Sequence, residues 1–211
     1  MNETAQFWRN WIQGWQRCRH ILNLEYFNGG CCFELRDGRR EKEWLLFDPA
    51  QLAAVLPRVS HRDYLCISGI DARFSLPQGW KPMMLADMMV NEQLYAMQPK
   101  SVPENVVVDY VRSAEHCRIT FKSEQGEIMC RGQVGYYNGF AVFDRINTDL
   151  AYRRQGWGSM MMNLLSQEAL LNGVKTGLLC ASEQGKLLYL SLGWRSIGQY
   201  LRIVRNDYTR D

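Results

Sequence analysis

The chain lacks the signatures of several large classes of protein. No stretch of its 211 residues approaches the roughly eighteen apolar residues that a membrane-spanning helix requires. Its first residues, Met1 to Thr4, have neither the basic nor the apolar segment of a secretory signal peptide. The seven cysteines are odd in number and include no C-x-x-C pair, which disfavours both a zinc site and a complete disulfide framework. We therefore expect a cytoplasmic protein with no metal ion and no membrane partner.

Strong charge is also missing. The net charge is +3, only 22% of the residues are charged, and the Lys and Arg residues are scattered along the chain. This pattern gives no support to nucleic-acid binding. The hydrophobic content of 46% is sufficient for a packed core, so the sequence predicts one large globular domain or two smaller ones.

Two common phosphate-binding motifs, G-x-x-x-x-G-K-[ST] and G-x-G-x-x-G, do not occur. Instead, R-x-x-G-x-G stands at residues 153–158, between a predicted strand over 140–148 and a predicted helix over 157–171. The first N–H groups of a helix have no intrahelical partner, and the helix dipole adds positive potential there. Gly156 and Gly158 have no Cβ, so a ligand can approach the main chain closely. The stretch therefore predicts a binding site for a pyrophosphate group.

A second motif lies at the correct distance downstream. A predicted strand over residues 174–180 is followed by a helix that contains Leu188-Tyr189 and ends before Gly193-Trp194. Together with R-x-x-G-x-G, this succession resembles the C-terminal half of the GNAT superfamily of N-acetyltransferases, over residues 106–204. The resemblance implies an α/β fold with a mixed sheet, the GNAT acyltransferase fold, and acetyl-CoA as co-substrate. Two positions depart from the family pattern, because Ser182 replaces a frequent asparagine and Gly185 a usual alanine.

The resemblance also implies roles for individual residues. Tyr189 holds the place of the general acid that protonates the departing thiolate. The main chain of the predicted central strand would bind the thioester, and the glycine loop would bind the pyrophosphate. The implied acetyl-CoA-binding residues are Ile146, Asn147, Thr148, Arg153, Arg154, Gln155, Gly156, Trp157, Gly158, Ser159, Ser182 and Lys186.

The general base is less well determined. Asp144 lies on the central strand with the same parity as Ile146 and Thr148, so it would face the same cleft if no bulge intervenes. We therefore name Asp144 as the candidate base. A solvated carboxylate at a strand edge is the competing interpretation, and His116, Glu115 or a chain of water molecules are alternative bases.

The N-terminal part is predicted to form an α/β lobe of its own. Residues 5–24 carry aromatic residues at helical spacing, which indicates a face packed on a core, with a ligand pocket as the alternative. Residues 83–97 are predicted to be a methionine-rich helical segment. The cluster of turn residues at 77–82 predicts a boundary between a lobe of residues 1–82, which would cover the acceptor side, and an acetyl-CoA-binding domain of residues 83–211.

The sequence thus predicts a monomeric or homodimeric N-acetyltransferase. It would transfer the acetyl group of acetyl-CoA to the primary amine of a small molecule or amino acid, by direct attack in a ternary complex. A non-catalytic CoA-binding regulatory domain and a protein or peptide N-acetyltransferase are the alternatives.

Overall fold

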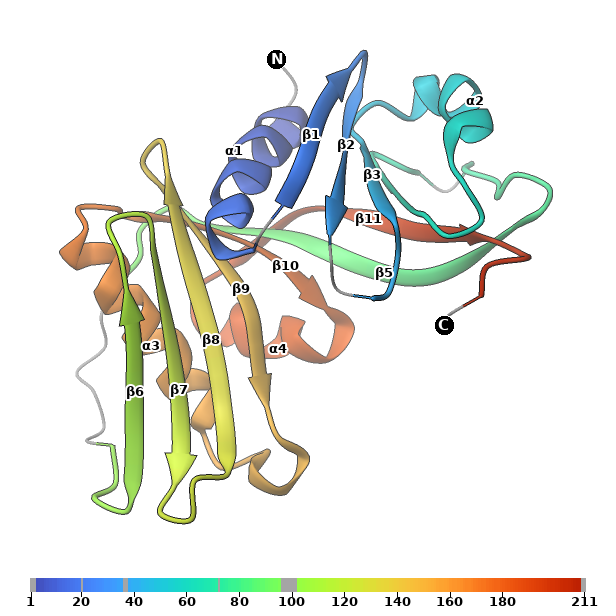
Figure 1. The fold of residues 1–211 in the computed structure, drawn as a ribbon. Coiled ribbons are helices and arrows are strands. Elements are labelled where there is room, and N and C mark those ends of the chain that lie inside the picture. The colour runs from blue at the N-terminus through green and yellow to red at the C-terminus, as the bar shows by residue number, and fades with distance from the viewer. Residues whose placement is uncertain (1–2, 20, 36–37, 72, 96–101, 210–211) are drawn as a thin grey trace.

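The computed structural model describes residues 3–19, 21–35, 38–71, 73–95 and 102–209. Figure 1 shows that the chain forms a long twisted sheet with helices on both faces. The elements of the first half are α1 (Glu3–Cys18), β1 (Ile21–Phe27), β2 (Gly30–Leu35), β3 (Lys42–Leu46), η1 (Pro49–Gln51), α2 (Leu52–Val55), η2 (Leu56–Arg58), β4 (Tyr64–Ser68) and β5 (Trp80–Asn91). The elements of the second half are β6 (Val106–Arg112), β7 (His116–Ser123), β8 (Ile128–Tyr137), β9 (Phe140–Thr148), η3 (Leu150–Tyr152), α3 (Trp157–Leu171), β10 (Thr176–Ser182), α4 (Glu183–Ser191) and β11 (Arg195–Arg205). Within these ranges, no helix is both long and apolar enough to cross a bilayer.

The strands of the described residues form one mixed sheet in the order β1-β2-β3-β4-β11-β5-β10-β9-β8-β7-β6. Each half contains one parallel pair joined by a helical crossover, β3 with β4 through α2 and β9 with β10 through α3. The halves then exchange a strand: β5 pairs with β10 of the second half, and β11 pairs with β4 of the first. The predicted α/β fold with a mixed sheet is therefore confirmed, and the boundary predicted at residue 82 falls within β5.

The helix predicted over residues 83–97 is wrong in the part that the structure describes. Residues 80–91 form β5, and 96–97 lie outside the described residues. The strand lies between β11 and β10, and its last six residues are all buried. A strand covered on both faces has a continuous apolar run, which periodicity cannot distinguish from a buried helix.

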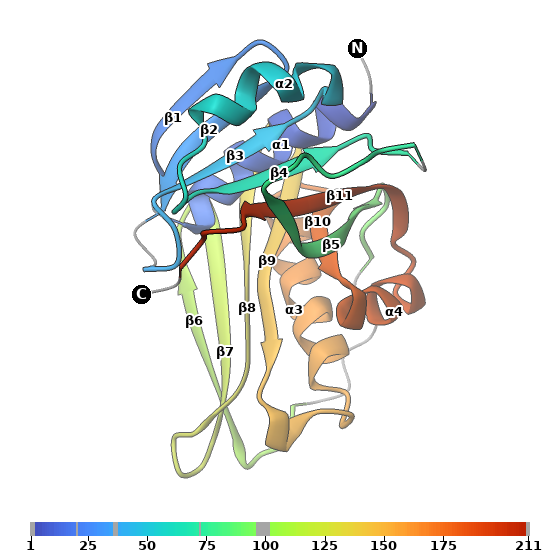
Figure 2. The same ribbon diagram turned by 90° about the vertical axis from the view of Figure 1, so that its right-hand side faces the viewer.

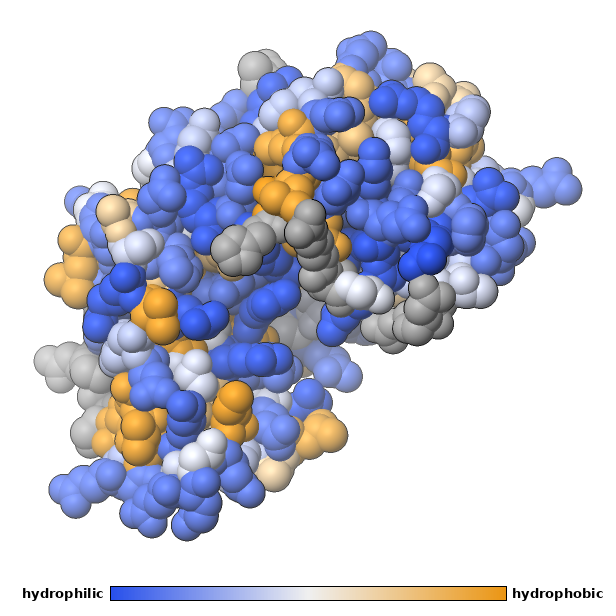
Figure 3. Space-filling view, in the orientation of Figure 1, coloured by the Kyte–Doolittle hydropathy of each residue, from blue (hydrophilic) through white to orange (hydrophobic). Residues whose placement is uncertain are grey.

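The helices divide between the two faces of the sheet, as Figures 1 and 2 show. The cluster with α1 contains Val142 of β9, whereas the cluster with α3 and α4 contains the neighbouring Phe143. Because successive side chains of a strand point to opposite faces, α1 and α3 cover opposite faces of β9. The short α2 packs on the first half, on the face opposite α1. Figure 3 shows a largely hydrophilic surface on the side seen in Figure 1, with small apolar patches. One of them lies over the parts of β6 and β7 that are farther from α1.

The aromatic stripe of the N-terminal segment packs on the core, as predicted, although Trp11 and Trp15 also line a cavity, and the helix is shorter than expected. It ends at Cys18, and the chain continues as β1. Trp8, Trp11 and Trp15 are 1%, 6% and 3% exposed, so each is almost completely covered. The helix lies very close to the sheet because Gly14 meets Gly135 of β8 backbone to backbone, with no room for a Cβ on either. This contact fixes α1 over the strands that carry the candidate site.

Candidate active site

The site is organised by a split between two parallel strands. The residues that lie opposite each other in β9 and β10 are Phe140 and Thr176, Ala141 and Gly177, and Val142 and Leu178, and the pairing stops there. Beyond these residues β9 continues beside β8, while β10 continues beside β5 as far as Ser182. The two strands therefore diverge, and their facing main-chain groups are available to an extended ligand.

The glycine loop lies at the end of β9, at the entrance to α3. Gly156 is the N-cap of α3 in the left-handed conformation, at φ 88°, and a Cβ there would meet no atom within 4 Å. The first bond of the helix runs from Met160 N–H to the Gly156 carbonyl at 3.0 Å. The N–H groups of residues 157–159 consequently have no intrahelical acceptor, and they point out of the helix end. This geometry fits a pyrophosphate, as the sequence predicts.

The polar side chains of the loop mostly stabilise the loop itself. Arg153 Nε donates to the Thr148 carbonyl at 3.1 Å, which holds the loop against the end of β9. Gln155 Nε2 donates to the Ala151 carbonyl at 3.2 Å. Trp157 is buried, whereas Arg154, at φ 62°, is exposed. The main-chain N–H groups at the start of α3, more than these side chains, are thus placed to contact a ligand.

Two residues that were predicted to bind acetyl-CoA have clear structural partners at α4. Ser182 is the N-cap of α4, and its hydroxyl accepts a hydrogen bond from Gly185 N–H at 3.3 Å. Lys186 Nζ lies 2.8 Å from Asp87 Oδ1 of β5, so its charge is already compensated. Both residues stand near the mouth of the split, and their contact with acetyl-CoA remains a prediction.

Tyr189 lies on α4 and is only 8% exposed. The edge of its ring lies over Gly185, where a Cβ would come within 3.0 Å of Cε2, which gives a reason for glycine at that position. Burial, with smaller contributions from Asp144 and Cys130, raises the pKa of Tyr189 to about 12. The phenol therefore keeps its proton at neutral pH and is able to donate it. The ring belongs to the same core cluster as Cys130 of β8 and Phe143 of β9.

A cavity of about 250 Å³ lies on the α1 face of the sheet. It reaches Asp144 and Cys180, which come shortly after the last paired residues of β9 and β10. The cavity therefore meets the split from the face opposite α3 and α4. Its lining residues are Trp11, Trp15, Arg19, Arg39, Arg40, Tyr64, Met83, Met84, Asp144, Cys180, Tyr200 and Arg202.

A β-bulge overturns the predicted orientation of Asp144. The pairing of β9 with β8 shifts between Asp144 and Asn147, and Arg145 adopts φ 53°. One extra residue reverses the alternation of side chains. Asp144 consequently lies on the α1 face with Arg19, whereas Ile146 packs against the α3 cluster. The assumption that these residues share one face is wrong.

The surroundings of Asp144 also disfavour it as a general base. Its carboxylate accepts two hydrogen bonds from Arg19, at 2.8 and 2.7 Å, and one from Gln133 at 2.7 Å. Burial raises the pKa of Asp144, but the contacts with Arg19 and Gln133 outweigh it and hold the pKa below the ordinary value. A carboxylate of this kind accepts a proton poorly at neutral pH. His116 lies on β7, two strands away from β9, and Glu115 precedes it in the turn.

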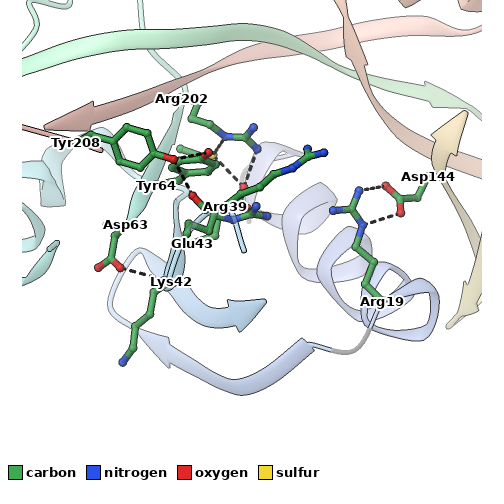
Figure 4. A network of polar contacts seen from close by, with 11 residues as sticks. Arg19, Arg39, Lys42, Glu43, Asp63, Tyr64, Asp144, Arg202 and Tyr208 are labelled. Carbon is green, nitrogen blue, oxygen red and sulfur yellow. Dashed lines mark hydrogen bonds and ion pairs between the residues drawn. The ribbon is translucent and has the colours of Figure 1, made fainter. Parts of the chain in front are cut away.

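A second group of charges lies on the opposite side of the cavity, where Arg39, Arg40 and Arg202 line it and Glu43 pairs with two of them. Glu43 of β3 is buried and forms ion pairs with Arg40 and, at 2.8 Å, with Arg202 of β11. Burial opposes the charge of Glu43, but the two arginines lower its pKa to about 2. Figure 4 shows Arg39, Glu43 and Arg202 on one side and the Arg19–Asp144 pair on the other. No motif marks these residues, because the fold brings them together from separate elements.

Metal binding has no visible basis in the part of the chain that the structure describes, where no group of three or more His, Cys, Asp or Glu side chains could hold an ion.

No protein-family model and no curated protein matches the sequence. Solved structures do match. The chain is similar to a GCN5-related N-acetyltransferase from Kribbella flavida, with 13% identity and a TM-score of 0.68 over 98% of this chain and 96% of that one. It is also similar to a putative acetyltransferase of the GNAT family from Novosphingobium aromaticivorans, with 13% identity and a TM-score of 0.59 over 97% and 100% of the two chains. A tandem GNAT protein from the clavulanic acid biosynthesis pathway shares 12% identity and a TM-score of 0.55 over 86% and 80%. The chain therefore has the GNAT fold that its two motifs predict.

Proposed function

We propose that this protein is an N-acetyltransferase that transfers the acetyl group of acetyl-CoA to the primary amine of a small molecule. The observation that carries the proposal is the meeting of the cavity with the split at Asp144 and Cys180. The glycine loop lies at the end of the same split, and Tyr189 lies on its other face. A donor held by the loop and an acceptor held in the cavity would therefore meet between β9 and β10.

The main chain would bind most of the donor. Free N–H groups of residues 157–159, together with the dipole of α3, suit the pyrophosphate. The unpaired edge of β9 at Ile146, Asn147 and Thr148 suits the extended arm that leads to the thioester. When bound, acetyl-CoA supplies an acetyl group activated as a thioester.

Two proton transfers are needed at the split, one to the departing sulfur and one from the amine. Tyr189 keeps its proton at neutral pH and would deliver it to the departing sulfur. The amine must lose a proton before it attacks. We assign that proton to water in the cavity, because the contacts with Arg19 hold the pKa of Asp144 below the ordinary value and make it a poor proton acceptor. Asp144 would instead keep a negative charge close to the incoming amine.

The lining of the cavity bears on the alternative acceptors. A protein or peptide acetylase that acts on basic segments would need acidic walls, whereas four guanidinium groups and one carboxylate line this cavity. Repulsion between like charges disfavours such segments. The regulatory alternative keeps the glycine loop but predicts no transfer to any amine.

The test is a screen of pooled primary amines, with CoA release followed by a thiol reagent and products identified by mass spectrometry. We expect at least one acetylated amine, formed faster than acetyl-CoA is hydrolysed. Saturable binding of acetyl-CoA without transfer to any amine would favour the regulatory alternative.

A further inference from the structure

The bulge in β9 contains a strained residue close to the point where the split opens. Pairing of β9 with β10 ends at Val142, and the bulge follows between Asp144 and Asn147. Within it, Arg145 adopts φ 53°, a conformation that costs free energy in any residue with a Cβ. Such strain persists only where the surrounding structure fixes the residue. Contacts next to Arg145 must therefore hold the bulge.

Asp144, the residue before Arg145, makes these contacts. Its carboxylate accepts hydrogen bonds from Arg19 Nε and Nη2, at 2.8 and 2.7 Å, and from Gln133 Nε2 at 2.7 Å. The Arg19 and Asp144 side chains are 18% and 10% exposed, so water competes little for these bonds. Two parallel bonds between a guanidinium and a carboxylate fix direction as well as distance. Asp144 and Gln133 also lie opposite each other in the last pair before the register shifts.

Arg19 is itself held in place. Its guanidinium lies over the ring of Trp15, with the central carbon 4.3 Å from the ring centroid. Its main-chain N–H donates to the Trp15 carbonyl at 2.9 Å, and its own carbonyl accepts from Ile21 N–H at 2.8 Å. The preceding helix is fixed on the sheet by the close contact of Gly14 with Gly135. Arg19 therefore links α1 to the bulge, as the pair with Asp144 in Figure 4 shows.

We infer that Arg19 is a positioning residue. Through Asp144 it holds the bulge, and the bulge sets the course of the β9 main chain at residues 146–148. A bulge bends its strand, and this one lies just beyond the last pair of β9 with β10, so it governs how the two strands diverge. The consequence for the thioester rests on the proposed function, in which this main chain binds the donor. The link between Arg19 and the bulge rests on the contacts described above.

Arg19→Gln tests the inference in the full chain. We expect kcat for acetyl transfer to the amine that the screen identifies to fall about tenfold to a hundredfold, because a displacement of about 1 Å at a reacting group can cost that much. The Kd of CoA, which has no thioester, should change less than about twofold, because the glycine loop has its own contacts. Titration calorimetry with CoA also counts the folded sites, so a loss of folded protein does not enter kcat.

Arg17→Gln is the matched control. Arg17 lies on the same end of α1, but its guanidinium donates to the Gln13 carbonyl at 2.7 Å and lies over the ring of Tyr137. Its kcat should stay within about twofold of the parent value. Arg19→Lys keeps the charge beside Asp144 but cannot donate two parallel bonds from a planar group, so it should lose less activity than Arg19→Gln. It also replaces Arg19→Gln if that variant fails to fold.

A second substitution separates strain at the bulge from other effects of Arg19. Glycine adopts a positive φ without cost, whereas alanine does not. In the Arg19→Gln background, Arg145→Gly should therefore raise kcat at least about threefold, and Arg145→Ala, which removes the same side chain, should not. Equal kcat values in the two double variants would overturn the inference, because Arg19 would then act by another route than the bulge.

Amide hydrogen exchange without any substrate, followed by mass spectrometry, makes the test independent of the proposed function. Arg19→Gln should speed exchange in the segment 143–148 at least about tenfold and leave the segment 157–171 unchanged, and Arg17→Gln should change neither. Parental exchange in 143–148, or a parental kcat in Arg19→Gln, would overturn the inference and leave the proposed function standing. Faster exchange in a protein whose parent transfers acetyl to no amine would support the link between Arg19 and the bulge and contradict the proposed function.

Discussion

At the scale of single residues, Tyr189 is held in one protonation state by its environment. Its burial keeps the pKa near 12, above the ordinary value of 10.0. The folded protein therefore binds the phenolic proton more tightly than the unfolded chain does. Across the pH range of most enzyme assays, Tyr189 is a proton donor and not a base.

Tyr189→Phe tests this role. The substitution keeps the ring and its packing on Gly185 and Trp194, so stability and acetyl-CoA affinity should change by no more than about 1 kcal/mol. Loss of a positioned general acid typically lowers the rate about 10²–10⁴-fold, and the loss should appear in kcat. An acyl donor with a more acidic leaving thiol should reduce the deficit, because that thiolate departs without a proton. Equal kcat values for the parent and the variant would exclude Tyr189 from the mechanism.

The sequence placed Tyr189 on the last helix and the two glycines at the entrance to α3, and the structure has them there, but the predicted orientation of Asp144 was wrong. The motif fixes the positions of Tyr189, Gly156 and Gly158 relative to each other. The face of Asp144, by contrast, depends on the bulge at Arg145, and nothing in the side chain of Arg145 signals φ 53°. Parity arguments along a strand fail wherever one residue is inserted in the ladder.

At the scale of elements, the entrance to α3 depends on the left-handed conformation of Gly156. Gly126, in the turn between β7 and β8, offers a matched control, because it has φ 83° against 88° and likewise has open space where a Cβ would lie. Alanine at either position should destabilise the fold by about 1–2 kcal/mol. Gly156→Ala alone should also weaken acetyl-CoA binding several-fold or more, because relief of the strain turns the N–H groups of the helix end. Chemical denaturation and titration calorimetry measure the two effects. Equal affinity in both variants would place the pyrophosphate elsewhere.

The ion pairs of Glu43 join β3 to β11 across β4. The pKa of Glu43 falls from 4.5 to about 2 on folding, so its contribution to stability is complete above about pH 5 and is lost as the pH falls toward 2. The shift corresponds to about 3 kcal/mol. Glu43→Gln leaves two buried guanidinium groups without their carboxylate and should destabilise the protein by about 3–5 kcal/mol at pH 7.

The stability difference between the parent and Glu43→Gln should therefore shrink as the pH is lowered from 5 toward 2, as followed by urea denaturation. Glu41→Gln is the control, because the Glu41–Arg62 pair is 56% and 45% exposed. It should change stability by less than about 1 kcal/mol, with little dependence on pH. A difference between the parent and Glu43→Gln that stays constant with pH would contradict the ionised state of Glu43.

The sequence predicted the elements of the second half better than those of the first. The strand at 140–148 and the helix at 157–171 have their predicted bounds, because the loop between them marks both ends. In the first half, β5 was predicted as a helix, since its methionines and its burial on both faces hide the strand period. The arginines of the cavity come from the residue after α1, from β11 and from the connection between β2 and β3, and no local pattern relates them.

At the scale of the whole molecule, the exchange of β5 and β11 joins the two halves into one sheet. β5 and β11 pair with each other along most of their length, and each also pairs with a strand of the opposite half. Neither half can separate without breaking both ladders. We therefore expect a single cooperative unfolding transition, coincident by tryptophan fluorescence and far-ultraviolet circular dichroism.

Removal of β11 is a second test of whether the two halves fold as one unit. A chain that ends at Trp194 should lose cooperative folding in both halves, because the edges of β4 and β5 lose their partner. Two separate transitions in the full chain, or a native-like first half in the shortened one, would show that the halves fold independently.

The central claim of this account is that donor and acceptor meet in the split between β9 and β10. A crystal structure of the complex with acetyl-CoA tests it most directly. We predict the pyrophosphate at about 3 Å from the N–H groups at the start of α3, the thioester between the diverging strands beside Tyr189, and the acetyl methyl directed toward Asp144 and Cys180. A donor that lies along the outside of α3 and α4, with its acetyl group away from the cavity, would contradict the account.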